Sequence, residues 1–169
     1  LGLEVETGVG KTGVIGTLKG NSSSKTIALR ADMDALPMQE TTDVEYKSKN
    51  EGIMHACGHD GHTAILLGAA EALSNKKHLL NGDIKFLFQP AEEGQGGARY
   101  MIQDGALDNV DEVYGLHLWN YQKYGTIGVK PGPIMAAADI FQITIHGKGG
   151  HGAAPQGTKD AVLIASHLI

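Results

Sequence analysis

The sequence has one cysteine, five prolines and few aromatic residues, which make up 5% of its 169 positions. A single cysteine allows no internal disulfide, and this favours a reducing compartment such as the cytoplasm. No uninterrupted apolar stretch approaches the roughly 20 residues of a membrane span. The formal net charge is -5 and no cluster of Lys and Arg is present, so we expect neither a membrane nor a nucleic acid as partner.

Residues 54–62 hold the only cysteine and three of the eight histidines. Thiolate, imidazole and carboxylate groups are the ligands of zinc and similar divalent ions. Cys57 and His59 are two residues apart, so in an extended segment their side chains point the same way. Packing alone could explain a lone buried cysteine or a structural histidine, but three histidines around one cysteine favour a metal site.

The apolar run at residues 64–73 predicts a buried helix, with Asp60 or Thr63 as its N-cap. Cys57 would then lie near the positive end of the helix dipole. That field, like a bound cation, favours the thiolate over the thiol.

Two strand-like segments add further donors. The alternating residues Ile84, Phe86 and Phe88 predict a strand that ends near Pro90 and is followed by Glu92 and Glu93. Adjacent carboxylates at the carboxyl end of a strand fit an α/β active site, where one can bind metal while the other transfers protons. An isolated pair of this kind is otherwise a solvated acidic turn. The second segment, a strand expected over 112–119, presents His117 among apolar neighbours.

The order of the expected elements predicts an α/β layer fold. Strands at 12–19 and 26–30 would precede the helix, and a second helix near 98–104 would separate the last two strands. Residues 20–24 read as an exposed hairpin loop between the first two strands, and the glycines at 94–97 as a flexible connection to the second helix. Near residues 130–133 the character changes, so we expect one domain over 1–132 and another over 133–169, with a long strand at 140–145 and a helix from Lys159.

Five motifs occur in order and carry a family resemblance: residues 30–37 (RADMDALP), 55–62 (HACGHDGH), 89–94 (QPAEEG), 115–117 (GLH) and 147–155 (GKGGHGAAP). Together they resemble the amidohydrolase branch of the dinuclear metallopeptidases, which contains aminoacylases, hippurate hydrolases, indoleacetyl-amino-acid hydrolases and N-acetyl-diaminopimelate deacetylases. The resemblance implies a zinc-peptidase-like catalytic domain with a mixed sheet flanked by helices. It also implies the beginning of an inserted ferredoxin-like α+β lid domain that carries a homodimer interface, so the chain resembles a fragment of a longer protein.

Position by position, the resemblance implies two divalent metal ions, zinc or manganese, with cobalt or nickel also acceptable. Cys57 would bridge the ions, with His59 and His117 on one and Glu93 on the other. Glu92 would act as general base and then general acid. The implied supporting groups are Asp34 behind the ligands, His151 from the lid as the oxyanion donor in a partner subunit, Asp32 where related enzymes have a histidine ligand, and His62 in a supporting or structural role. None of His146, His151 and His167 matches the last histidine ligand of the family.

The implied reaction is hydrolysis of the amide bond of an N-acyl amino acid or small peptide by a metal-bridging hydroxide, with Glu92 as base. The alternative is a non-catalytic metal-binding or dimerisation module derived from this family. A third possibility, a phosphate-binding loop at residues 8–12, lacks the required glycine because Val5 stands there. The segment after it also reads as a strand and not as the helix that would hold the phosphate.

Overall fold

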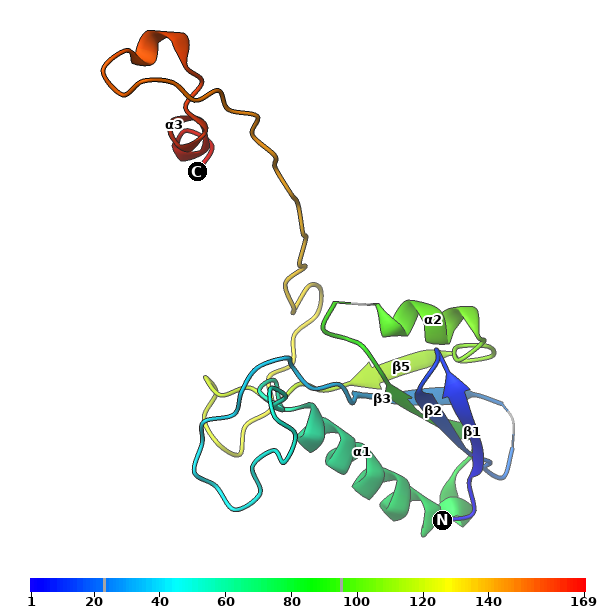
Figure 1. Ribbon diagram of the computed structural model, residues 1–169. Coiled ribbons are helices and arrows are strands. Elements are labelled where there is room, and N and C mark those ends of the chain that lie inside the picture. Colours follow the sequence, from blue (N-terminus) through cyan, green and yellow to red (C-terminus); the bar gives the residue numbers. More distant parts are fainter. Residues whose placement is uncertain (23, 95) are drawn as a thin grey trace. The chain divides into compact units, whose positions relative to one another are not determined.

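The structure is a computed structural model that describes residues 1–22, 24–94 and 96–169 (Figure 1). The chain divides into two compact units, Leu1–Lys123 and Tyr124–Ile169. The domain boundary expected near residues 130–133 stays a prediction, as does the ferredoxin-like nature of the second domain. None of the helices in the described ranges is long and apolar enough to cross a membrane.

Five strands of the first unit form one mixed sheet in the order β1-β2-β4-β3-β5. β2 is antiparallel to β1 and β4, whereas β3 is parallel to both β4 and β5. The strands are β1 Glu4–Val9, β2 Gly13–Leu18, β3 Thr26–Asp32, β4 Asp83–Gln89 and β5 Glu112–Gly115. The expected hairpin loop at residues 20–24 is wrong, because β4 lies between β2 and β3. Ser23 of that loop falls outside the described residues.

β1 is a strand that the sequence analysis missed. It is an edge strand of the sheet, and its first five residues are exposed. It joins β2 through a tight turn in which the Lys11 amide donates to the Gly8 carbonyl at 3.1 Å. Residues 8–12 therefore form a hairpin turn between two strands, which excludes a phosphate-binding loop at this place.

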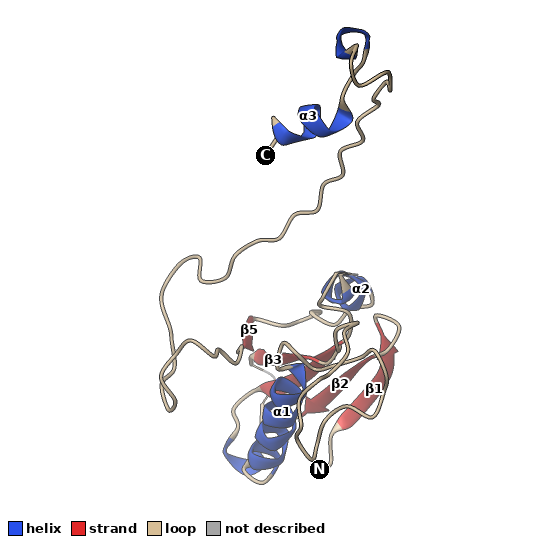
Figure 2. Ribbon diagram, turned by 60° about the vertical axis from the view of Figure 1, so that its left-hand side comes forward, coloured by secondary structure: helices blue, strands red, loops and turns tan. Residues whose placement is uncertain are grey.

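Two helices cover opposite faces of the sheet, α1 His59–Ser74 and α2 Gly97–Gln103 (Figures 1 and 2). Successive residues of the central strand β4 face the two helices alternately. Phe86 packs in the core under α1 with Leu66 and Ala70, whereas Leu87 packs in the core under α2 with Met101. This two-sided burial explains the apolar sequence of β4 and confirms a mixed sheet flanked by helices.

α1 corrects the sequence expectation in two respects. Its buried residues are His59, His62, Leu66 and Ala70, spaced by three or four, so one stripe faces the sheet while the opposite side is exposed. The predicted side-chain cap is also wrong. The N-cap is Gly58, in the left-handed conformation with φ of 88°, and no side chain caps this helix.

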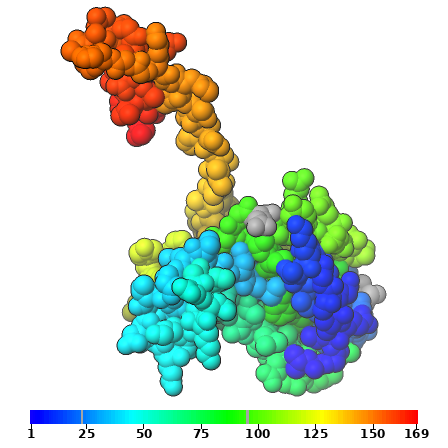
Figure 3. Space-filling view, in the orientation of Figure 1, coloured from blue at the N-terminus to red at the C-terminus, as the bar shows by residue number. Residues whose placement is uncertain are grey.

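The connection from β3 to α1 is a long surface segment, seen in cyan in Figure 3. Leu36 and Met54 exchange backbone hydrogen bonds of 2.9 and 3.0 Å and close it into a loop. The closure returns the chain to the sheet just before Cys57. A short 3₁₀ helix, Lys77–Leu79, leads from α1 to β4.

Beyond Gly115 the chain departs from the expected strands. β5 ends there, because its ladder with β3 stops at the Arg30–Gly115 pair. The long strand expected at 140–145 is absent from the described part of the second unit, since nothing described there pairs with these residues. That unit instead contains a bridge between Lys148 and Lys159, the 3₁₀ helix Pro155–Gly157 and the expected helix, α3 Ala161–Ser166.

Gly97 marks the tightest backbone approach near the end of β4, because a Cβ there would lie 1.7 Å from the Pro90 carbonyl oxygen. We expect Gly97→Ala to lower the free energy of unfolding by at least about 3 kcal/mol. The matched control is Gly68→Ala, at an exposed position of α1 where a Cβ meets nothing within 4 Å; it should raise stability by up to about 1 kcal/mol. Urea denaturation measures the free energy of unfolding of both variants. Equal changes would contradict the close approach of the backbone at Gly97.

Candidate metal centre

The predicted site residues gather at one edge of the sheet. β3 is parallel to β4 and β5, so the carboxyl ends of these three strands meet, as in other α/β active sites. The segments that follow these ends, and the start of α1, carry six of the predicted residues: Asp34, Cys57, His59, Glu92, Glu93 and His117.

His59 lies at the centre of this edge with a side chain only 1% exposed. Its Nδ1 is 3.3 Å from Asp34 Oδ1. Its Nε2 lies 3.6 Å from Asp32 Oδ2, 3.9 Å from Glu93 Oε1 and 4.0 Å from Glu92 Oε2. Within the described part of the chain, neither ring nitrogen makes a hydrogen bond. A buried imidazole surrounded by carboxylate oxygens in this way has the setting of a metal ligand.

Cys57 and His117 approach each other from two elements, with Sγ and Nε2 3.4 Å apart. The other ring nitrogen of His117, Nδ1, is 2.6 Å from the Leu118 carbonyl oxygen. Because a carbonyl only accepts, Nδ1 carries the proton and Nε2 presents its lone pair toward Cys57. One ligand atom each of Cys57, His59 and His117 lies within 4.8 Å of the others.

The sequence analysis expected Cys57 and His59 to face one way from an extended segment. Instead, Gly58 between them adopts its left-handed conformation as the cap of α1. Glycine adopts this conformation without the steric cost that a Cβ brings. The expected proximity is therefore present, but a turn produces it.

Glu92 and Glu93 lie on the loop after β4 and form a second group of donors with His59. Their side chains are 43% and 29% exposed, so they line the open side of the site. The Glu93 amide donates to Asp34 Oδ2 at 3.0 Å, which ties this loop to the end of β3. Ala91, just before the pair, has φ of 51°, a conformation that is uncommon for a residue with a Cβ.

Asp34 connects this loop to His59 and stays ionised. Burial alone would raise the pKa of its carboxyl group. The backbone N–H groups of Glu93 and Glu92 outweigh this effect, and the net pKa is lowered. The carboxylate is thus placed to orient the His59 ring through Nδ1.

The thiol of Cys57 corrects a second expectation. Burial, followed by the neighbouring carboxylates of Glu93, Glu92 and Asp32, raises the pKa of Cys57 to about 11. Proximity to the start of α1 therefore does not by itself make Cys57 a thiolate, because burial and the nearby carboxylates both oppose the charge. A bound cation would oppose the same carboxylates.

Asp32 and His62 lie behind the ligands and are both fully buried. Asp32 Oδ1 is 2.6 Å from His62 Nδ1, and Asp32 Oδ2 accepts from Arg30 Nη1 at 2.8 Å. Arg30 Nε also donates to Gln89 Oε1 at 2.8 Å. The sequence analysis missed Arg30, although its position two residues before Asp32 on one strand places both side chains on the same face.

His151 belongs to the second unit and is exposed. Its Nδ1 accepts from the Ala153 amide at 3.2 Å, so in the neutral ring Nε2 carries the proton and can donate it in a hydrogen bond. Its predicted role in a partner's site stays a prediction.

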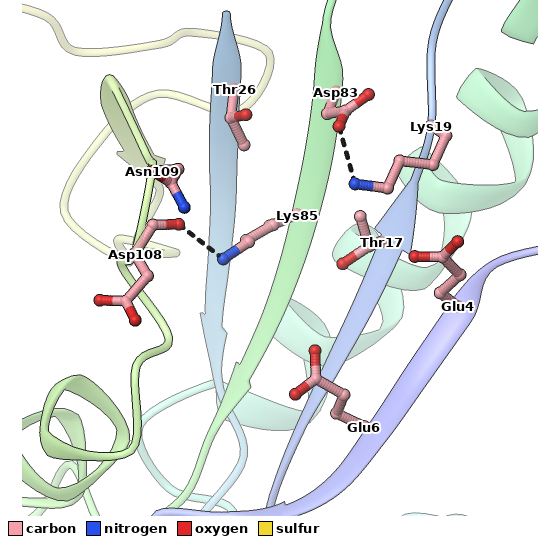
Figure 4. A pocket seen from close by; sticks show the side chains of 9 residues that line it. All are labelled: Glu4, Glu6, Thr17, Lys19, Thr26, Asp83, Lys85, Asp108 and Asn109. Carbon is pink, nitrogen blue, oxygen red and sulfur yellow. Dashed lines mark hydrogen bonds and ion pairs between the residues drawn. The ribbon is translucent and has the colours of Figure 1, made fainter. Parts of the chain in front are cut away.

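A separate polar cavity of about 440 Å³ lies at the amino ends of β3 and β4, far along the strands from the candidate centre (Figure 4). Lys19 forms an ion pair of 2.9 Å with Asp83, and Lys85 donates to the Asp108 carbonyl at 2.9 Å. Lys19 thereby lowers the pKa of Asp83. These contacts bind the strands together, so the cavity reads as structural.

The donor set at the carboxyl edge fits divalent metal ions. It offers one thiol, two imidazoles and two carboxylates on the open side, a combination that zinc, manganese, cobalt or nickel accepts. The buried side-chain atoms without a hydrogen-bond partner in the described residues include both nitrogens of His59 and Oδ1 of Asp34. These orphaned atoms face the same group of donors.

Comparison with known proteins agrees with this reading. The chain is 54% identical to thermostable carboxypeptidase 2 of Saccharolobus solfataricus, over 99% of the chain and 44% of that protein. It is 52% identical to an N-acyl-L-amino acid amidohydrolase of Geobacillus stearothermophilus, over 94% of the chain and 43% of that protein. The chain therefore spans less than half the length of these relatives.

A solved structure gives the same result. The crystal structure of the Bacillus subtilis protein YxeP, described as a dinuclear metal-binding peptidase of the M20 family, superposes with a TM-score of 0.75 at 46% identity. The superposition covers 78% of this chain and 37% of that one. The model of peptidase family M20/M25/M40 matches residues 28–167, and the chain accordingly belongs to this family.

Proposed function

We propose that this chain is part of a metal-dependent amidohydrolase that cleaves the amide bond of N-acyl amino acids or small peptides. The observation that carries the proposal is the gathering of Cys57, His59 and His117 within 4.8 Å, beside a second group of His59, Glu92 and Glu93. The names of the relatives, carboxypeptidase and N-acyl-L-amino acid amidohydrolase, support an amide substrate that ends in an amino acid.

Cys57, His59, His117 and Glu93 would hold two divalent ions. When bound, the ions would polarise the amide carbonyl and lower the pKa of water toward about 7. The chain's own contribution is to keep these donors on rigid elements. α1 carries His59, and the segment after β5 carries His117 with its Nε2 directed inward.

Glu92 would transfer the protons. Its half-exposed carboxylate lies on the open side, where a substrate and a water molecule can reach it. Among the described residues, this side chain makes no hydrogen bond. It would take a proton from the attacking water and deliver it to the leaving amine nitrogen. The bond from the Glu93 amide to Asp34 fixes the backbone next to it, so the carboxylate keeps its place through both steps.

His151 would donate through Nε2 to the oxyanion of a partner subunit's site, which makes the active protein a homodimer. The tautomer set by the Ala153 amide supports this role, because it leaves Nε2 as the donor. A cytoplasmic location is part of the proposal, since a reducing compartment keeps Cys57 available as a ligand.

Glu92→Gln should separate chemistry from metal binding. Because an amide cannot accept the proton, we expect kcat on an N-acyl amino acid to fall by about 10²–10⁴-fold, while elemental analysis still finds the wild-type metal content. The control Glu71→Gln removes another exposed carboxylate, on α1, and should leave kcat unchanged. Full activity of metal-loaded Glu92→Gln would exclude this role.

Metal binding should release a proton from Cys57. With a pKa of about 11, the thiol is protonated at neutral pH, whereas a metal ligand must be the thiolate. Calorimetric titration with Zn²⁺ in two buffers of different ionisation enthalpy should show about one more proton released per chain by the wild type than by Cys57→Ala. Because the thiol must lose its proton when the ion binds, the affinity for Zn²⁺ should rise as pH increases toward the pKa of Cys57. Equal proton release by both proteins would contradict thiolate ligation.

The shared site can be tested by mixing two inactive proteins. Glu92→Gln lacks the base and His151→Ala lacks the oxyanion donor, so a mixed dimer contains one site with both groups intact. We expect hydrolysis to reappear after subunit exchange, which sedimentation of differently labelled chains can verify. Complete exchange without recovered activity would place His151 outside the partner's site.

A further inference from the structure

We infer that His62 is a positioning residue that fixes His117 through the backbone of Leu118, with Asp32 and Arg30 holding His62 in turn. The inference rests on the proposed metal centre. It concerns residues that bind neither metal nor substrate, and it gives a function to the buried histidine at the end of the 55–62 motif.

Both ring nitrogens of His62 are already occupied. The Leu118 amide donates to Nε2 at 2.9 Å, so Nε2 is unprotonated. In the neutral ring Nδ1 then carries the proton and donates it to Asp32 Oδ1, 2.6 Å away. His62 belongs to a geometrically possible metal group with Asp32 and His59, but it has no lone pair left for an ion.

Asp32 is fixed as firmly as His62. Its second oxygen, Oδ2, accepts from Arg30 at 2.8 Å, and Thr63 of α1 donates to its backbone carbonyl at 3.1 Å. The carboxylate is therefore held between β3 and α1 with one oxygen for each partner. This arrangement orients the His62 ring, because the ring must donate to an acceptor that cannot move.

The backbone of Leu118 connects His62 to His117 through two consecutive peptide groups and binds both rings. Its N–H is bound by His62, and its carbonyl accepts from His117 Nδ1 at 2.6 Å. The Leu118 side chain lies against the first turn of α1, where a Cβ on Gly61 would be 2.6 Å from Leu118 Cδ1. The direction of His117 Nε2 is thus set relative to α1.

α1 also begins with His59, so the same helix fixes two proposed ligands of one ion. The His62 ring stands next to both of them, with ring centroids 5.4 Å from His59 and 4.7 Å from His117. Loss of the Leu118 link should release His117, which β5 no longer holds because this strand ends at Gly115. The ion that His117 binds should then be held less tightly.

Two substitutions of His62 separate its two hydrogen bonds. The amide of Gln reaches the place of Nε2, so His62→Gln can still accept from the Leu118 amide. The amide of Asn reaches the place of Nδ1, so His62→Asn can still donate to Asp32 but leaves Leu118 unbound. Both are tested in the full-length protein by Zn²⁺ competition with a chelator and by the cobalt–thiolate absorption of the Co²⁺-loaded form.

We expect His62→Asn to weaken one of the two ions by about 10–100-fold, whereas His62→Gln binds both ions nearly as the wild type does. In a His117→Ala background, His62→Asn should cause no further loss, because its effect passes through His117. Equal affinities in both variants, a loss confined to His62→Gln, or additive losses with His117→Ala would each overturn the inference.

Stability is measured alongside affinity, because a purely structural role would lower the unfolding midpoint of the apoprotein without changing Zn²⁺ affinity. If His62→Asn does not fold, Arg30→Gln serves instead. It removes the ion pair with Asp32 Oδ2 at the other end of the same series of hydrogen bonds and should weaken binding of the same ion. A wild type that binds no metal would refute the proposed function itself. A wild type that binds two ions, with variants that bind them equally well, would refute only the positioning role.

Discussion

The parallel pairing of β3 with β4 is the constraint on which the rest of the structure depends. Its register places Asp32 beside Gln89, so both strands end at the same level and their following segments face each other. Asp34 can then accept from the Glu93 amide, and β5, parallel to β3 on the other side, delivers His117 to the same edge. A shift of one residue would turn Asp32 to the opposite face of the sheet and separate it from His62.

Charge is the second constraint on the proposed centre. Asp32, Asp34, Glu92 and Glu93 surround His59, and Arg30 opposes this charge through its ion pair with Asp32. Burial, and then the carboxylates of Glu93, Glu92 and Asp32, raise the pKa of Cys57, because these carboxylates oppose a further anion. Bound divalent cations would offset this excess of negative charge. The same residues that make the thiol a weak acid would, with cations bound, make the site a strong cation binder.

The pattern of elements predicted an α/β layer fold, and the residue types grouped Cys57, His59, Glu92, Glu93 and His117 as donors, while the family resemblance implied the mixed sheet flanked by helices. The sequence did not predict features that depend on long-range contacts. β1 was missed, and it is an edge strand whose first five residues are exposed. The cap of α1 and the protonation of Cys57 were wrong because a left-handed glycine and a ring of distant carboxylates decide them. The expected strand at 140–145 failed because a strand needs a partner, which no local pattern supplies.

The three histidines of the centre show why residue type alone does not assign a role. Among the described residues, His59 makes no hydrogen bond through either ring nitrogen. His117 is bound through Nδ1 to the Leu118 carbonyl, and its Nε2 faces the sulfur of Cys57. His62 is bound through Nδ1 to Asp32 and through Nε2 to the Leu118 amide. A ring with a fixed Nδ1–H has a directed lone pair on Nε2, which suits a ligand when it faces other donors, whereas a ring whose Nε2 already accepts from a backbone amide has no lone pair left for an ion. His59 and His62 lie three residues apart on one helix face and are equally buried. Their difference comes from Asp32 and from the backbone amide of Leu118, which lie 30 and 56 positions from His62 along the chain, so spacing within the motif could not have separated them.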